Sequence, residues 1–166
     1  MNRTSFIKKG LFTVSSIALL PSSSFSNETA ELFEPSEIQD FVLAAHRDLE
    51  ETKKILEAKP LILNCANQPR KGDFETAIGG ASHMGRRDIA DLLVSSGARL
   101  DIFNYAFLGY DEFVKKLITD YPGLIKTSGP HGFTLLHHAK VGGQNDLASW
   151  LQEKGLTKTF FEGIFD

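Results

Sequence analysis

The feature that most constrains the fold of this sequence is a turn glycine that recurs with the same kind of apolar pattern after it. Gly85, Gly109 and Gly143 are each followed by apolar residues at helical spacing, and the steps between them are 109 − 85 = 24 and 143 − 109 = 34 residues. The apolar triplets are Ile89, Leu92 and Leu93; Phe113, Leu117 and Ile118; and Leu147, Trp150 and Leu151. Unrelated amphipathic helices have no reason to keep this register. The pattern therefore predicts helix hairpins that stack and bury their apolar faces against neighbours.

The most informative unit begins shortly before the last of these turns. Residues 134–139 read Thr-Leu-Leu-His-His-Ala, which resembles the T-P-L-H-x-A fingerprint of ankyrin repeats with only the Pro missing. Thr134 can cap the first helix by accepting a hydrogen bond from a backbone N–H one turn on, and His137 can bond to the Thr134 hydroxyl and to a neighbouring loop. The chain is thus similar to the ankyrin repeat family.

This resemblance implies an all-α fold, an ankyrin-repeat solenoid of about four helix-turn-helix units over residues 37–157. The first unit is expected to start with a capping-box pattern at Ser36. The third unit lacks the hairpin that usually precedes its first helix, because Gly109 follows Gly85 too closely. The tail, residues 158–166, is expected to cover the open end of the last repeat, with docking on a partner as the alternative.

The N-terminus has the features of an export signal. A basic start precedes the apolar run Leu11–Leu20, and small residues follow, so residues 1–26 are predicted to be a signal peptide and residues 27–36 a leader. Residues 2–8 resemble a bacterial twin-arginine signal in which Thr4 replaces the second Arg, and a general secretory signal fits the same residues. We therefore expect a periplasmic or secreted protein with no membrane span after cleavage.

The charge balance argues against a nucleic-acid partner. The chain has 18 basic and 21 acidic residues, for a net charge of −3. Loss of the predicted signal peptide removes three basic residues and no acid, which leaves 18 − 3 = 15 basic residues and a net charge of 15 − 21 = −6. A mildly acidic surface does not favour binding to nucleic acid. The single Cys65 cannot form an internal disulfide, and it is expected to be buried or else available to another thiol.

Two patterns could bind a phosphate or a metal, and the repeat register offers a structural explanation for each. Gly80–Gly85 has the glycine spacing of a phosphate-binding loop, but it lacks the Lys and the Ser or Thr that hold phosphate and magnesium. His137 and His138 point about 100° apart on a helix, so they cannot bind one ion together. His131 could approach His138, which would give at best a two-ligand surface site.

Catalytic groups are equally hard to assemble from the sequence. Asp73 and Glu75 lie near a turn and a helix start, where carboxylates usually cap helices or are solvated. Cys65 has His83 as its nearest histidine in sequence, and no third residue can be named to orient that histidine. We therefore expect no enzymatic activity, no cofactor and no metal ligand.

The resemblance implies a binding scaffold, because ankyrin repeats bind other proteins through a concave surface formed by first helices and loop tips. The residues expected to contact a partner are His46, Arg47, Arg70, Lys71, Phe74, His83, Met84, Phe107, His131 and Phe133. Cationic and aromatic side chains of this kind are frequent interface hot spots.

The function expected from the sequence is therefore an exported, non-catalytic module that binds another protein, with a co-exported enzyme as one candidate. The alternative is a small-ligand or enzymatic site in the notch left by the missing hairpin, around His83, Arg86, Tyr105 and Tyr110. A structural role as an oligomer is a third possibility. The sequence does not identify the partner, since repeat scaffolds share a fold and not a target.

Overall fold

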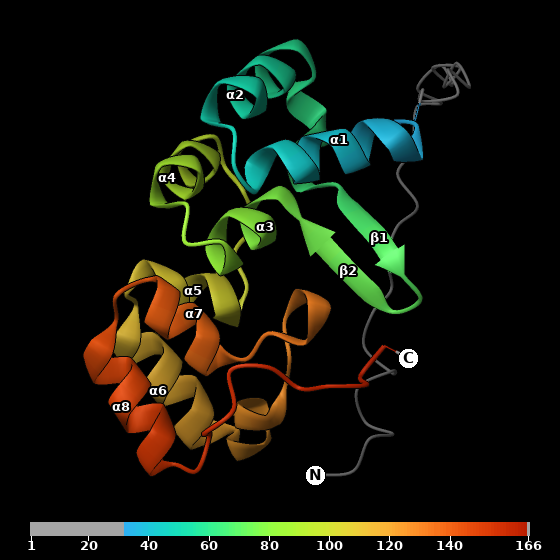
Figure 1. Ribbon diagram of the computed structural model, residues 1–166. Helices are drawn as coiled ribbons and strands as arrows, with labels where there is room; N and C mark the ends of the chain where they lie inside the picture. Colours follow the sequence, from blue (N-terminus) through green and yellow to red (C-terminus); the bar gives the residue numbers. More distant parts are fainter. Residues whose placement is uncertain (1–31, 166) are drawn as a thin grey trace, which may run out of the picture. The chain divides into compact units, whose positions relative to one another are not determined.

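Helices follow one another in pairs along residues 32–165, the part of the chain that the computed structural model describes (Figure 1). The pairs are α1 (Pro35–Ala45) with α2 (Leu49–Ala58), α3 (Ala77–His83) with α4 (Arg87–Ser95), α5 (Ile102–Leu108) with α6 (Asp111–Asp120), and α7 (Leu135–Val141) with α8 (Asn145–Glu153). None of these helices is both long and apolar enough to span a bilayer. The predicted signal peptide and the first part of the predicted leader lie outside the described residues.

The connections between pairs differ from one another. Between α2 and α3 lie the 3₁₀ segment η2 (Pro60–Asn64) and the strands β1 (Ala66–Arg70) and β2 (Asp73–Thr76). Between α6 and α7 lie the 3₁₀ segments η3 (Pro122–Lys126) and η4 (Pro130–Gly132). Between α4 and α5 there are only residues 96–101. The described unit is therefore mostly helical with one small sheet, and the third pair starts without a strand hairpin, as the sequence predicted.

The two strands form an antiparallel hairpin whose inner side carries acidic residues. Its register pairs Ala66 with Thr76, Asn67 with Glu75 and Arg70 with Asp73, with an irregularity between Asn67 and Arg70. Side chains alternate between the two sides of a strand, so Asp73 and Glu75 share one side while Phe74 occupies the other. Asp73 and Glu75 are buried and Phe74 is exposed.

Polar side chains define where the first helix of each pair begins. Thr76 accepts a hydrogen bond from the Gly79 N–H at 3.2 Å, and Thr134 accepts one from the His137 N–H at 3.4 Å. The predicted cap at Thr134 is thus confirmed. The predicted start at Ser36 is wrong: Glu34 caps α1, because Pro35 has the fixed φ and missing N–H that suit the first helical position.

Helices pack in the order of the chain. The first helices contact one another in the series α1, α3, α5 and α7, while α2 contacts α4 and α6 contacts α8. The tail also returns to the helices, since the Phe161 N–H donates to the Gly132 carbonyl at 2.9 Å and the Thr134 N–H donates to the Thr159 carbonyl at 3.0 Å. The tail therefore pairs with the loop that precedes α7.

The close contact between α5 and α7 depends on Gly142. A Cβ atom at this position would lie 2.9 Å from the carbonyl carbon of Phe107 and would collide with its oxygen. We expect Gly142→Ala to lower the free energy of unfolding by about 1–3 kcal/mol, because backbone atoms cannot yield as a flexible side chain can. Urea unfolding measures this. Gly123→Ala is the control, since a Cβ there meets nothing within 4 Å; equal stability of the two variants would contradict the proposed collision.

His138 makes the stability of the fold dependent on pH. It is fully buried, its Nδ1 bonds to the Thr134 carbonyl at 2.9 Å, and burial lowers its pKa to about 4 from an ordinary value of 6.5. Between pH 6.5 and pH 4 the unfolded chain binds a proton that the folded chain does not, so stability falls as pH falls. We expect His138→Leu to gain roughly 3 kcal/mol relative to the unaltered chain between pH 7 and pH 4. A constant difference across this range, in urea unfolding, would show that His138 is not the source.

Candidate metal centre

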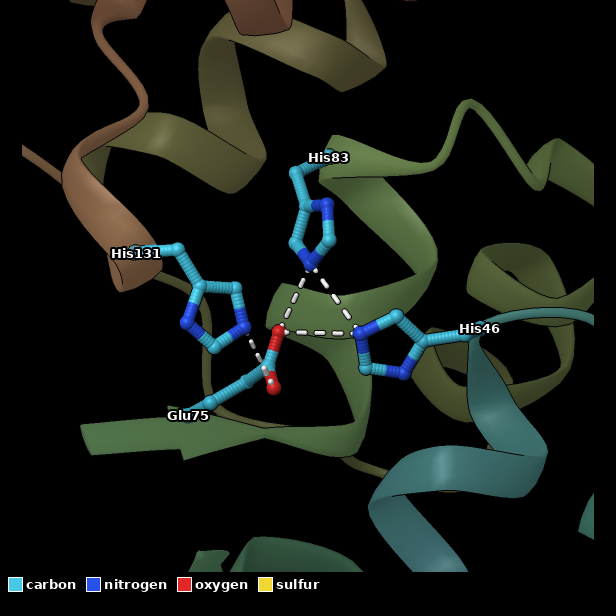
Figure 2. A group of neighbouring side chains, drawn as sticks. All are labelled: His46, Glu75, His83 and His131. Carbon is cyan, nitrogen blue, oxygen red and sulfur yellow. Dashed lines mark hydrogen bonds and ion pairs between the residues drawn. The ribbon is translucent and has the colours of Figure 1, made fainter. Parts of the chain in front are cut away.

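Four side chains from four segments of the chain converge on one point (Figure 2). They are His46, which follows α1; Glu75 of β2; His83, the last residue of α3; and His131 of η4. Each directs one nitrogen or oxygen atom toward the others, and these atoms all lie within 4.8 Å of one another. Glu75 lies among the three imidazole rings.

The short distances within this cluster are hydrogen-bond distances, and they lie near the spacing of donors around a single ion. Glu75 Oε1 lies 2.7 Å from His83 Nε2 and 3.2 Å from His46 Nε2, while Glu75 Oε2 lies 3.1 Å from His131 Nε2. The Nε2 atoms of His46 and His83 are 3.1 Å apart. A tetrahedral zinc ion with bonds of about 2.0–2.1 Å has ligands roughly 3.3 Å apart. The pairs named above are close to this spacing, and the donor atoms farthest apart, within 4.8 Å of one another, must approach by up to about 1.5 Å to bind one ion.

Gly80, one of two adjacent glycines in α3, makes room for the cluster. A Cβ atom on Gly80 would lie 2.8 Å from Cε1 of His46, so any larger residue would displace that ring. A Cβ atom on Gly79 would lie 3.4 Å from Oγ1 of Thr76 and 3.5 Å from Cγ of Pro130, which are ordinary contacts. Glycine inside a helix costs about 1 kcal/mol relative to alanine. At Gly80 the absence of a side chain carries this cost, and it leaves the space that the His46 ring occupies.

Hydrogen bonds on the far side of two rings orient them toward the cluster. Nδ1 of His46 lies 2.7 Å from the Val42 carbonyl, and Nδ1 of His131 lies 2.9 Å from Asp73 Oδ2. The other oxygen of Asp73 accepts from the His131 backbone N–H at 2.9 Å. A histidine that binds a metal through Nε2 usually donates its Nδ1–H to a carbonyl or carboxylate in this manner. Both Nε2 atoms are thereby directed at the centre.

The backbone at His131 is itself unusual. Among the described residues it is the one non-glycine residue with positive φ, at 60°. A side chain in this region costs free energy and persists only where surrounding contacts hold it, often at functional sites. Here the two hydrogen bonds to Asp73 hold the loop so that the ring of His131 meets Glu75.

The electrostatics of the site favour a cation among the rings. Burial by itself would raise the pKa of Glu75, but hydrogen bonds from His46 and His83 outweigh it, and the pKa is lowered to about 2. Burial likewise opposes charge on His46, yet the Glu75 carboxylate outweighs it and raises the pKa of His46. Asp73 and Glu75 are 0% and 3% exposed, so their negative charges need compensation nearby. Arg70, whose Nη2 lies 3.3 Å from Asp73 Oδ2, provides it for Asp73, and protons on the imidazoles or a divalent ion can provide it for Glu75.

His83 completes the set as the most enclosed ring. It is 5% exposed and Phe133 stacks on it with ring centroids 5.0 Å apart. Its Nδ1 is buried and has no hydrogen-bond partner within the described part of the chain. Its carbonyl accepts a bond from Nε2 of His137 at 2.8 Å. Of the two ring nitrogens, Nε2 is the one that faces Glu75 and His46.

No protein-family model matches this chain, and no curated protein matches it. The likeness to ankyrin repeats accordingly remains a resemblance carried by the residues named above.

The structure divides the residues that the sequence assigned to partner binding. His46, His83 and His131 belong to the cluster. Phe107 is 1% exposed and His83 is 5% exposed, so neither can contribute to a surface, contrary to the sequence interpretation. Phe107 is buried because the short connection before α5 brings this helix directly against α3 and α7.

The remaining predicted contact residues lie at or near the surface. Phe74 and Met84 are 59% and 53% exposed, and Phe133 is half-buried between His83 and His137. The cationic members Arg47, Arg70 and Lys71 are exposed.

The residues predicted to line the notch make contacts in different places and do not surround one common space. His83 points into the cluster, and Arg86 pairs with Asp88 and donates to the Arg47 carbonyl. Tyr105 packs edge-on against Tyr110 with centroids 5.5 Å apart.

Cys65 is half-buried, and its Sγ lies 3.9 Å from the Leu61 carbonyl.

Sequence reasoning missed the carboxylates of this site. A solvated role for Asp73 and Glu75 is wrong, since both are buried and bonded to histidines. The suggested approach of His131 to His138 is also wrong, because His138 bonds within its own helix to the Thr134 carbonyl. One signal was present: two acids flank a Phe in a short strand, which places both acids on one side.

A substitution next to the site can test it without removing any ligand. Gly80→Ala should displace His46 and weaken Zn²⁺ binding by roughly tenfold or more, comparable to loss of an outer hydrogen bond at a metal site. Gly79→Ala is the matched control, and it should keep the affinity while adding about 1 kcal/mol of helix stability. Competition with a chromophoric chelator measures both affinities. Equal affinities would show that His46 is not a ligand.

Proposed function

We propose that this protein binds one divalent transition-metal ion, of the Zn²⁺ class, through His46, Glu75, His83 and His131. The observation that carries the proposal is the convergence of three Nε2 atoms and one carboxylate from four separate elements. Imidazole suits zinc, copper, nickel and iron, and three imidazoles with one carboxylate make a four-coordinate set that zinc commonly accepts. The oriented rings of His46 and His131 support the same assignment.

A structural role fits this site better than catalysis. Four protein ligands fill a tetrahedral ion, whereas catalytic zinc sites keep one position for water or substrate. The most enclosed ligands, Glu75 and His83, are almost fully buried. The proposal therefore keeps the non-catalytic role expected from the sequence and adds a bound ion to it.

We also propose that the scaffold is an ankyrin-type stack that binds another protein outside the cytoplasm. Two observations support this: the helix pairs pack in chain order, and the first helix of each later pair starts at a capping Thr or Asp. Exposed Phe74 and Met84, with the cations Arg47 and Arg70, are available for a partner. Export, and an enzyme as the partner, remain proposals that rest on the sequence.

Titration of the full-length chain tests the ion site. Zn²⁺ added in competition with a chromophoric chelator should bind at one ion per chain, and Co²⁺ should give the intense visible absorption of a tetrahedral site. His138→Leu is the control, because it removes a histidine that lies outside the cluster. Binding of neither ion, or loss of binding in this control, would contradict the assignment.

Affinity capture tests the partner proposal. The unaltered chain should enrich a protein that is absent with Arg47→Glu/Phe74→Ala, since both side chains are exposed and neither belongs to the ion site. Helical content should be the same in both baits. Equal capture by the two baits would exclude this surface.

A further inference from the structure

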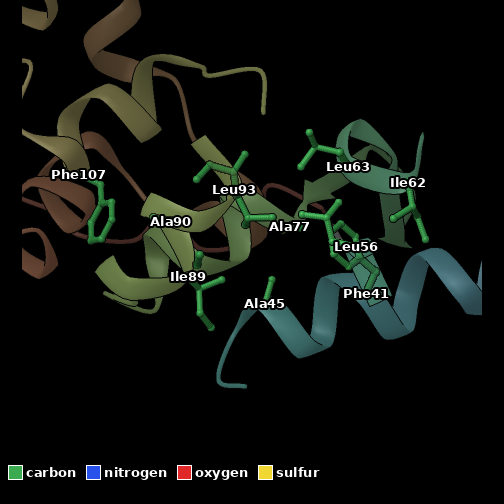
Figure 3. Packing of buried hydrophobic residues seen from close by; sticks show 12 residues of the cluster. Phe41, Ala45, Leu56, Ile62, Leu63, Ala77, Ile89, Ala90, Leu93 and Phe107 are labelled. Carbon is green, nitrogen blue, oxygen red and sulfur yellow. The ribbon is translucent and has the colours of Figure 1, made fainter. Parts of the chain in front are cut away.

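The hydrophobic core of the described unit consists of two clusters. The first is built from α1 to α4 and the short segments between them, together with Phe107 of α5, and Figure 3 shows its packing. The second is built from α5 to α8 and the residues around them. Of the proposed ligands, His46, Glu75 and His83 lie on segments that pack around the first core, whereas His131 lies between α6 and α7. The ligands thus come from both parts.

The loop that carries His131 is held on two sides. On one side it pairs with the tail through the bonds from Phe161 to Gly132 and from Thr134 to Thr159. On the other side His131 bonds to Asp73 and Glu75 of the strand hairpin. The tail reaches the same hairpin, where the ring of Phe165 lies 5.7 Å from the Arg70 guanidinium.

The strand hairpin presents two buried carboxylates, Asp73 and Glu75, to this loop. Arg70 pairs with Asp73 at 3.3 Å and offsets one of the two negative charges. A divalent ion bound to neutral imidazoles would offset the charge of Glu75, and it would add a bond between His131 and the other ligands. The positive φ of His131 costs conformational free energy, which favours relaxation of the loop when that bond is absent.

We infer that the ion is a structural crosslink that fixes the loop 128–134 and the tail 157–161 onto the α1 to α4 part of the chain. Without the ion this loop and tail detach, while α1 to α4 stay folded around their own core. The inference rests on the proposed ion site and adds a regulatory role to it. The concentration of the ion then controls whether the tip of the β1–β2 hairpin forms one continuous surface with the loop 128–134 and the tail.

Hydrogen–deuterium exchange of the full-length chain tests this inference. Exchange is compared between the Zn²⁺-saturated chain and the chain with excess chelator, with Zn²⁺ binding measured on the same sample. In the chelated chain, peptides covering 128–134 and 157–161 should exchange at least about tenfold faster, because local opening exposes their hydrogen-bonded amides. A peptide covering 88–95 in α4 should change less than about twofold. At a free Zn²⁺ concentration near the dissociation constant of the unaltered chain, Gly80→Ala should exchange faster in the loop and tail than the unaltered chain does, because it binds the ion about tenfold more weakly.

Each result decides between the two claims. Zn²⁺ binding without faster exchange in the loop and tail after chelation would overturn the proposed crosslink, while the proposal that the site binds an ion would still hold. Equally faster exchange in α4 would also overturn it, because the ion would then support the whole unit. Absence of Zn²⁺ binding would overturn both.

Discussion

Replacing Glu75 by Gln should lower the affinity of the chain for Zn²⁺ at least about a hundredfold. Even the loss of an outer hydrogen-bond partner weakens a metal site 10–100-fold, and Glu75 contacts all three imidazoles. Glutamine keeps the volume of the side chain, so the packing around β2 is preserved while the negative charge is lost. Competition with a chromophoric chelator measures the dissociation constant.

The control for this variant is Asp88→Asn, which neutralises an acid that pairs with Arg86 and lies outside the cluster. It should bind Zn²⁺ with the affinity of the unaltered chain. An affinity of Glu75→Gln within a few-fold of the unaltered chain would mean that the carboxylate is not a ligand, and the proposed centre would have to be abandoned.

Removing the ion should lower the thermal midpoint of unfolding by roughly 10 °C when the free Zn²⁺ concentration before removal is a thousand times the dissociation constant. The reason is mass action: an ion that binds only the folded chain stabilises it by about 4 kcal/mol at that ratio. Circular dichroism during heating, with buffered Zn²⁺ or with excess chelator, measures the shift. Ion binding is coupled to folding because the unfolded chain does not hold His46, His83 and His131 together.

Glu75→Gln provides the reference for this experiment. Its midpoint should be nearly the same in Zn²⁺ and in chelator, which would assign the stabilisation to the site and not to ions bound elsewhere. A midpoint of the unaltered chain that does not respond to Zn²⁺ would contradict a structural ion.

Local sequence signals predicted the helix pairs well, for physical reasons. Glycines such as Gly85 take a positive φ at the turn, and apolar residues after them, such as Ile89 and Leu93, are buried. The predicted triplet after the second turn is wrong at Phe113, which is 47% exposed. The cap at Thr134 is likewise a contact between residues three apart. These features depend on neighbouring residues, so the sequence shows them directly.

The site could not be predicted in the same way, because it depends on contacts across the fold. His46 and His131 are 131 − 46 = 85 residues apart, and they come together because α1 packs against α3 and η4 packs against β2. The sequence singled out Gly80 only as part of a glycine spacing, and its use became evident only beside the His46 ring. Phe107 was assigned to a surface, although the sequence did show the missing hairpin before α5 from which its burial follows.

The most direct test of the central claim is X-ray absorption at the zinc edge of the full-length chain loaded with one Zn²⁺. The proposed centre predicts four nitrogen or oxygen neighbours at about 2.0–2.1 Å, with the outer-shell pattern of several imidazoles. A sulfur neighbour at about 2.3 Å would place the ion at Cys65 instead. That result, or a shell of oxygen alone without imidazole, would contradict a site formed by His46, Glu75, His83 and His131.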